Sequence, residues 1–198
     1  MLKFAVAAGI ACALATPAYA QDDAVLAGLS YDRSGIRVES RAAIETPIFS
    51  GDPTDGETFA LGRGMTLGWE GGYDLPVTRR LTVGPYATFE RSNLENCDGK
   101  DCIWSRGTIS GGLHVAYMRG EKTSYYAKIG YARLALEADV WGQQLSDSNA
   151  GVQIALGYEH VIADAIYVRM EGGYADNGRI FAVDFQRYHS AIGVGMRF

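Results

Sequence analysis

The residues best suited to acid–base or nucleophilic chemistry are His189, its neighbour Ser190, and the carboxylates Glu159 and Glu171. Together they could form the serine, base and acid set used in acyl transfer and ester hydrolysis. A nucleophile must lie within hydrogen-bond reach of its base, whereas adjacent residues of a β-strand point to opposite faces. If His189 and Ser190 share a strand, only a bulge could bring both to one substrate, so the spacing argues against catalysis.

The first twenty residues have the pattern of a cleavable signal peptide. Lys3 precedes an apolar run at 4–14, and Ala18-Tyr19-Ala20 supplies the small-residue cleavage pattern. The run is too short to span a bilayer as a helix. We expect cleavage after Ala20 and one barrel domain over 21–198. The alternative, lipid attachment at Cys12, lacks the aliphatic residue expected three positions earlier.

Two cysteines remain after cleavage, Cys97 and Cys102, and they flank the short stretch Asp-Gly-Lys-Asp. An exported protein enters an oxidising compartment in which thiols form disulfides, so we predict a disulfide that closes a short loop. A metal site would need further ligands nearby, and His114 and His160 lie on other segments. We therefore predict no metal site and no cofactor.

The charge of the chain limits its partners. Removing the signal segment takes away one cation, Lys3, and no acid, so the formal net charge moves from −5 to −6. This negative charge argues against nucleic acid as a partner. After Gln21 no run of eighteen apolar residues occurs, so no transmembrane helix is predicted.

Apolar residues instead alternate with small or polar ones in eight runs, each bounded by turn-forming residues. The runs are 35–45, 60–74, 81–90, 107–118, 124–136, 149–161, 166–175 and 183–198. A strand that crosses the outer membrane needs about 9 to 11 residues. The connections alternate, with long ones at 46–59, 91–106 and 137–148 and short ones at 75–80, 119–123 and 162–165. This pattern predicts an all-β fold, an eight-stranded antiparallel transmembrane β-barrel.

The parity of each run separates two faces. In the run 107–118, Ile109, Leu113 and Val115 share one face, and Ser110 and His114 share the other. Across all runs the polar face collects five cations and five anions: Arg37, Glu39, Arg41, Glu70, Glu90, Lys128, Glu159, Arg169, Glu171 and Arg197. An eight-stranded barrel is just wide enough for side chains to fill its interior. We predict that these charges pair there, because an unpaired ion in a confined site is costly.

The last run has a more specific pattern. Ile192, Val194 and Met196 alternate with smaller residues and are followed by Phe198. This segment resembles the terminal strand of bacterial outer-membrane proteins, and Gly72-Tyr73-Asp74 and Gly157-Tyr158-Glu159 look like elements of opacity-type and OmpA/OmpX-like small barrels, chiefly alphaproteobacterial. The resemblance implies that Ile192, Val194, Met196 and Phe198 serve as an assembly signal read by the barrel-assembly machinery. It also implies a lipid bilayer with lipopolysaccharide as the surroundings.

Three functions remain open, because a fold hosts many functions. The first is a non-enzymatic barrel with a charge-filled, largely closed lumen, which serves membrane integrity or surface interaction through its outer loops. The second is a narrow ion-permeable channel. The third is a lipid A-modifying enzyme, disfavoured by the spacing of His189 and Ser190. We expect a monomer in which Arg63 and Arg133, which break the apolar parity near outer strand ends, contact lipopolysaccharide phosphates.

Cleavage of the signal segment is directly testable. We expect the exported protein to begin at Gln21, which N-terminal sequencing or intact-mass measurement of the membrane fraction would show. A mature chain that retains residues 1–20, or one lipidated at Cys12, would contradict this prediction.

Overall fold

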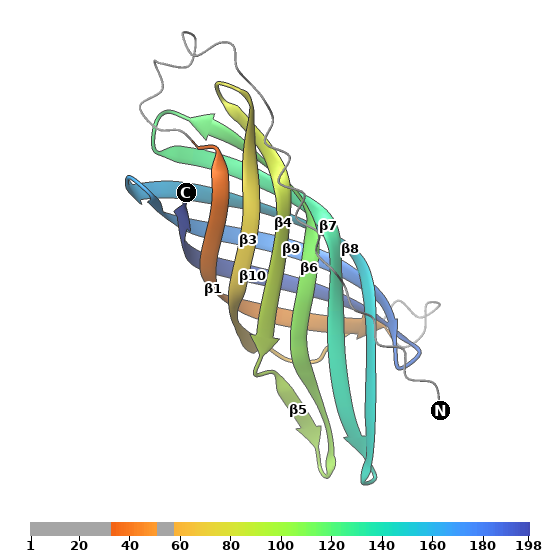
Figure 1. Cartoon of the computed structure of the whole chain (residues 1–198). Coiled ribbons are helices and arrows are strands. Elements are labelled where there is room, and N and C mark those ends of the chain that lie inside the picture. The colour runs from red at the N-terminus through yellow and green to blue at the C-terminus, as the bar shows by residue number, and fades with distance from the viewer. Residues whose placement is uncertain (1–32, 51–57) are drawn as a thin grey trace, which may run out of the picture.

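The computed structural model of this chain describes residues 33–50 and 58–198, whose strands form one closed antiparallel sheet (Figure 1). The ring consists of β1 Gly35–Ser50, β3 Gly64–Thr78, β4 Leu81–Ser92, β6 Asp101–Arg119, β7 Thr123–Val140, β8 Gln143–Ala163, β9 Ile166–Ile180 and β10 Val183–Arg197. Each strand pairs with the next, and β10 pairs with β1 to close the ring. The predicted eight-stranded antiparallel barrel is confirmed. No helix in the described ranges could cross a membrane.

The two ends of the barrel differ. At one end, here the turn end, short turns at 79–80, 120–122 and 164–165 join neighbouring strands, and the chain finishes there (Figure 1). At the other, the hairpin end, strands continue as extended hairpins that turn at 99–100, 141–142 and 181–182. Two short strands lie at this end, β2 Thr58–Ala60 against β1 and β5 Glu95–Asp98 against β6.

The hairpins correct the predicted strand ends and loops. The segment 137–148, expected to be a long loop, is strand on both sides of a two-residue turn, since β7 reaches Val140 and β8 begins at Gln143. Similarly, 91–106 contains β5 and the start of β6. Beyond the barrel wall, β5 and the start of β8 are largely exposed on both faces, so no alternation of apolar residues marks them.

Within the wall, buried and exposed residues alternate along each strand, as in the pattern of β10. The exposed positions form an apolar outer belt, which includes Ile44, Leu67, Trp69, Phe89, Ile109, Leu113, Ile129, Tyr131, Val152, Ile154, Leu156, Met170, Ile192 and Val194. In a closed barrel every backbone group of the wall finds a partner in a neighbouring strand. An apolar outer surface on a wall with a fully hydrogen-bonded backbone is what a lipid bilayer requires.

The seam between the first and last strands is closed by the end of the chain. The amide of Phe198 donates to the carbonyl of Ile36 at 2.9 Å, and the amide of Ile36 donates to the carbonyl of Phe198 at 3.1 Å. Phe198 therefore completes the backbone pairing between β10 and β1. Phe198 itself is 70 % exposed.

Glycine lets the backbones of β6 and β7 approach each other closely. Gly112 on β6 pairs with Gly130 on β7, and a Cβ atom added to Gly112 would lie 2.1 Å from the carbonyl oxygen of Ile129. At Gly172, on β9, an added Cβ would meet nothing within 4 Å. The two glycines thus differ in the space available, although both lie within strands.

Gly112→Ala should destabilise the barrel by about 1 to 3 kcal/mol, because the added methyl group must displace backbone atoms. Gly172→Ala, the matched control, should leave stability nearly unchanged. Urea unfolding in lipid vesicles, followed by heat-modifiable gel migration, measures both. Equal stability of the two variants would refute this account of the β6–β7 contact.

Candidate functional site

The interior of the barrel holds the largest group of chemically active side chains. All ten residues predicted for the polar face are buried there. The structure adds four charged residues that the sequence analysis did not single out: Arg33, Glu45, Asp74 and Arg187. In the described residues the buried charges are therefore seven carboxylates and seven cations, which balance. Glu45 and Asp74 stand at the ends of predicted runs, where parity is hardest to assign.

Glu70 on β3 is the centre of this network. Its Oε1 accepts hydrogen bonds from Arg37 Nη1 at 2.9 Å and Arg169 Nη1 at 3.2 Å. Its Oε2 accepts from Arg41 Nη1 at 2.8 Å and Lys128 Nζ at 2.6 Å. Arg37 and Arg41 come from the neighbouring strand β1, whereas Lys128 and Arg169 come from β7 and β9, so the ion pairs run both along the wall and across the bore. One carboxylate thereby connects three other strands.

Glu171 on β9 is a second centre. It accepts hydrogen bonds from Arg41 Nη2 at 3.0 Å and from the Tyr126 hydroxyl at 3.1 Å, and it also pairs with Lys128. Arg41 in addition reaches Glu90 at 2.7 Å. Because Arg41 and Lys128 each contact both centres, the middle of the bore is one connected network. Carboxylates with several such donors are strongly stabilised in the charged form.

A further layer of ion pairs lies toward the turn end. Arg169 donates to Glu159 at 2.9 Å, and Arg197 donates to Asp74 at 2.9 Å while also lying 3.3 Å from Glu159. Near the hairpin end, Arg187 lies 3.4 Å from Glu45. Charges therefore neutralise each other along most of the bore.

Three tyrosines on the inner face flank these cations. The Arg169 guanidinium lies 4.5 Å from the centre of the Tyr126 ring, Lys128 Nζ lies 5.1 Å from that of Tyr86, and Arg197 lies 5.2 Å from that of Tyr167. Cations at such distances are attracted to the ring face. The aromatic rings also occupy space between ion pairs, so they help to fill the lumen.

Above the charges, at the hairpin end, the interior becomes apolar. We call this cluster the apolar cap, and it consists of Leu61, Leu94, Leu134, Leu136, Ile180 and Phe185. The alternation along the sequence does not reveal this cap, although Leu134 and Leu136 share the parity of Lys128 on β7. Leu61 and Leu94 lie in segments without regular strand, held inward by bonds from Leu61 N to Pro47 O at 2.9 Å and from Ser105 N to Leu94 O at 3.0 Å.

The candidate catalytic residues are not assembled. His189 is buried, with Nε2 3.3 Å from Glu171 Oε1, whereas Ser190 is exposed on the outer face. The wall of the barrel therefore separates the serine from its candidate base. His114 lies in the bore near Arg169, and His160 lies near the Thr123 hydroxyl.

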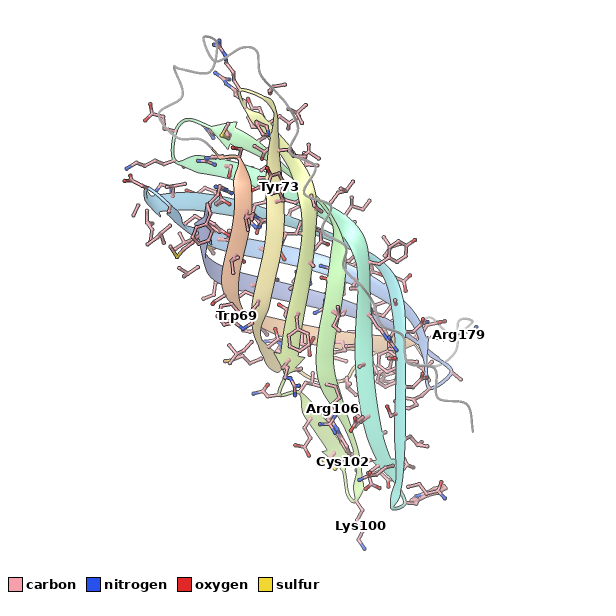
Figure 2. The ribbon with its side chains drawn as sticks, viewed as in Figure 1. Trp69, Tyr73, Lys100, Cys102, Arg106 and Arg179 are labelled. Atoms are coloured by element: carbon pink, nitrogen blue, oxygen red, sulfur yellow. A yellow bond between two sulfur atoms is a disulfide. The ribbon has the colours of Figure 1, made fainter. Side chains whose placement is uncertain are left out.

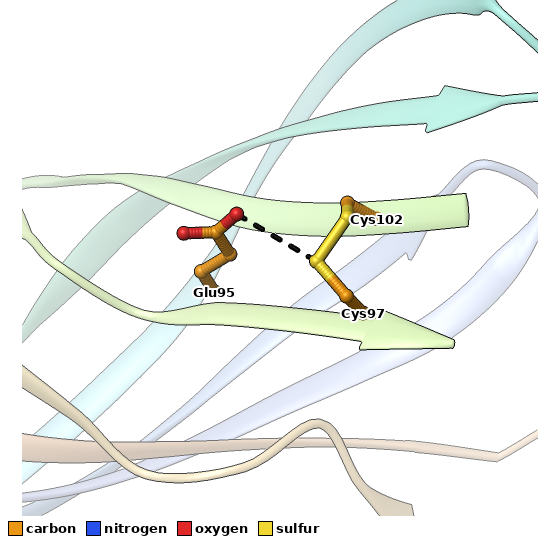
Figure 3. A group of neighbouring side chains, drawn as sticks. All are labelled: Glu95, Cys97 and Cys102. Carbon is orange, nitrogen blue, oxygen red and sulfur yellow. Dashed lines mark hydrogen bonds between the residues drawn. A yellow bond between two sulfur atoms is a disulfide. The ribbon is translucent and has the colours of Figure 1, made fainter. Parts of the chain in front are cut away.

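The two cysteines form the predicted disulfide, which is confirmed and joins β5 to the start of β6 (Figure 3). The Glu95 carboxylate lies 3.6 Å from Cys97 Sγ (Figure 3). Among the described residues, Glu95 and the cysteines are the one group spaced as metal ligands could be. Bonded to each other, the sulfur atoms are not thiolates, which are the form that binds metal.

The remaining predicted residues lie on the outer surface. Arg63 and Arg133 are both exposed near the hairpin end, and Arg133 Nη2 donates to the Ser148 hydroxyl at 2.7 Å. Ile192, Val194 and Met196 also face outward, in the apolar belt. The structure thus separates a charged interior from an apolar belt bordered by cations.

A closed sheet with an apolar exterior and a neutralised interior is a transmembrane β-barrel. The chain matches the family described as outer membrane protein beta-barrel domain over residues 4–198, and it belongs to that family. The resemblance to small outer-membrane barrels is confirmed, and the family indicates the Gram-negative outer membrane as the location. A search of curated proteins finds no match.

Solved structures share the fold. Neisserial surface protein A (NspA) aligns with a TM-score of 0.61 at 13% identity, covering 83% of this chain and 98% of that one. Ail, the attachment invasion locus protein of Yersinia pestis, aligns with a TM-score of 0.52 at 14% identity, covering 82% and 99%. At these identities the likeness shows the fold alone.

The charge network predicts a large effect at its centre. Glu70→Gln should lower the free energy of unfolding by about 3 to 5 kcal/mol, because it leaves buried cations without their shared carboxylate. Glu70→Gln combined with Lys128→Met should cost less than the two single changes added together. Urea unfolding in lipid vesicles measures these differences.

Glu137→Gln is the matched control, since Glu137 lies outside the barrel wall and pairs with the exposed Arg106. A single exposed pair contributes little to stability. If Glu70→Gln and Glu137→Gln cost the same, the central position of Glu70 in the network would be wrong.

Proposed function

We propose that this protein is a non-enzymatic, closed barrel that spans the outer membrane and serves membrane integrity or surface interaction through its outer hairpins. The observation that carries the proposal is that two layers of side chains, one charged and one apolar, fill the lumen. Balanced ion pairs centred on Glu70 cross the bore, and the apolar cap lies above them. Wide aqueous pores need about 16 to 18 strands, twice the number in this ring.

The proposed orientation follows from the two ends. Outer-membrane barrels have short periplasmic turns and longer extracellular loops. The turn end would therefore face the periplasm and the hairpin end the cell exterior. The β5–β6 and β7–β8 hairpins extend furthest in Figure 1, and Trp141, at the tip of the latter, is 89 % exposed. These hairpins would be the surface that meets partners.

Several predictions from the sequence belong to this proposal. Residues 1–20, which lie outside the described ranges, would direct export and be removed. Ile192, Val194, Met196 and Phe198 would form the strand read by the barrel-assembly machinery. Arg63 and Arg133 would contact lipopolysaccharide phosphates, because guanidinium pairs well with phosphate. We propose that the barrel acts as a monomer.

A narrow ion-permeable channel is the second candidate, favoured by one observation. Lys128 contacts both Glu70 and Glu171, and Arg41 contacts these two and Glu90, so each cation has alternative partners in place. A change of partner could open a path through the charge layer. The apolar cap opposes this, because ions do not cross a dry apolar layer readily.

Lipid A modification is the third possibility, and the geometry opposes it. His189 and Ser190 lie on opposite sides of the wall, so the serine has no base within reach from that histidine. We therefore propose that the protein does not catalyse a reaction.

Conductance in a planar bilayer tests the closed lumen. The wild-type barrel should show no steady ion current. Arg169→Ala should raise leakage, because it removes a side chain that pairs with Glu159 on the neighbouring strand and with Glu70 across the bore. Adding Leu134→Ala, which thins the apolar cap, should raise it further.

Arg179→Ala is the control, because Arg179 is exposed at the hairpin end and pairs with Asp184 outside the bore. This variant should show no current. A steady current through the wild-type barrel would contradict the closed lumen and favour the channel. If the Arg169→Ala/Leu134→Ala variant shows no current, neither the charge network nor the apolar cap determines closure.

A further inference from the structure

A polar hollow lies on the outer surface at the foot of the β5–β6 hairpin. It encloses about 460 Å³, within the range of pockets that bind small ligands. Its lining comes from the end of β4, the start of β5 and the outer part of β6: Arg91, Ser92, Asn93, Leu94, Glu95, Trp104, Ser105 and Arg106. Nothing in the sequence pattern singled out this hollow.

Two exposed cations border the hollow. Arg91 lies at the end of β4 with its guanidinium 6.0 Å from the centre of the Phe89 ring, and Arg106 lies on β6 with 58 % of its side chain exposed (Figure 2). Arg133 is on the next strand, β7, where it pairs with the residue Ile109. Arginines therefore stand outward on three consecutive strands of the ring, β4, β6 and β7, at the same end.

Trp104 forms the aromatic part of the hollow. Its backbone is paired with that of Glu95 on β5 and that of Glu137 on β7. Its Nε1 donates to Glu137 Oε2 at 3.0 Å, and Arg106 pairs with the same oxygen. The Arg106 guanidinium and the Trp104 indole hold the pKa of the Glu137 carboxyl below its usual range. Glu137 thus fixes both side chains.

The hollow adjoins the lipid belt. Phe89, beneath Arg91, and Ile109, three residues along β6 from Arg106, are exposed on the apolar face of the barrel. A ligand in the hollow would therefore have polar groups above the belt and room for apolar chains along it. This position matches the headgroup level of the outer leaflet.

We infer that this hollow binds the phosphorylated sugar headgroup of an outer-leaflet glycolipid, the chemistry of lipid A. The inference rests on the orientation in the outer membrane proposed above and extends it beyond Arg63 and Arg133. The guanidinium groups of Arg91 and Arg106 take the phosphate, the Trp104 ring packs on the sugar, and Glu95 accepts its hydroxyl or amide hydrogens. The acyl chains lie over Phe89 and Ile109.

Each group fits its task. A guanidinium has five N–H donors, and the exposure of Arg106 leaves donors for phosphate besides the pairing with Glu137. Indole rings offer a rigid apolar face with a polar edge, which suits the alternating surface of a sugar. The carboxylate of Glu95 disfavours a bare polyanion and favours a ligand that also carries hydrogen-bond donors. Charge and shape together therefore point to a phosphosugar rather than to a simple anion.

Native mass spectrometry of the mature barrel in detergent, titrated with lipid A, dephosphorylated lipid A, phosphatidylglycerol and glucose 1-phosphate, tests the inference. The wild-type barrel should retain lipid A most tightly. Arg91→Gln and Arg106→Gln should each weaken lipid A binding about tenfold, the usual effect of losing a charge-assisted hydrogen bond. Trp104→Leu should weaken lipid A and its dephosphorylated form alike.

Arg179→Gln is the matched control, an exposed arginine at the same end that lies far from Arg106 in the β9–β10 hairpin (Figure 2). It should bind as the wild type does, and heat-modifiable migration should show that every variant folds. Unchanged lipid A binding by the Arg91→Gln/Arg106→Gln double variant would overturn the site. Retention of phosphatidylglycerol equal to that of lipid A would contradict recognition of the sugar. Equal affinity for glucose 1-phosphate would contradict the role of the acyl chains. Conductance is measured on the same variants. A barrel that stays closed but does not bind lipid A would contradict this inference alone, and not the proposed closed lumen.

Discussion

The neutralisation of charge inside a narrow bore is the constraint on which the rest of this structure depends. The fourteen buried ionic groups described above cannot be hydrated as they would be in water, and each must find its counterpart on a neighbouring strand or across the lumen. Glu70 meets this demand by accepting from four cations on three other strands. The network thereby favours this arrangement of the strands, because it joins side chains of β1, β3, β7 and β9.

The same constraint ties the interior to the exterior. Side chains alternate with period two, so a shift of β3 by one residue against β1 would turn Glu70 toward lipid and Trp69 into the bore. Both changes are unfavourable, one for the buried charge network and one for the apolar belt. The pairing of Glu39 with Glu70 and of Ser40 with Trp69 therefore satisfies two opposed environments at once. In this barrel the contrast between a charged interior and an apolar exterior therefore fixes the register of β3 against β1.

The contrast between the charged interior and the apolar exterior also explains which features the sequence predicts well. Eight strands and the inner positions of ten charged residues follow from alternation, which the bilayer enforces over each crossing. The apolar cap does not follow, because Leu134 and Leu136 are apolar residues on the inner face, where the pattern predicts polar ones. Leu61 and Leu94 lie in irregular segments without any period. The extension at the start of β8 was missed for a related reason, since it is exposed on both faces and nothing there imposes alternation, whereas β7 keeps alternating as far as Ala138.

The cap and the outer hairpins are connected, and this links closure of the lumen to the surface outside it. Leu94 enters the cap from the segment that leads into β5, which the disulfide joins to β6. The amide of Trp141 at the tip of β7–β8 donates to Asp101 Oδ1 at 2.8 Å, so the two hairpins support each other. Residues that border the polar hollow, such as Glu95, therefore belong to the segment that also seals the bore. A ligand bound there would hold that segment in place, and occupancy of the outer surface would stabilise the closed lumen rather than open it.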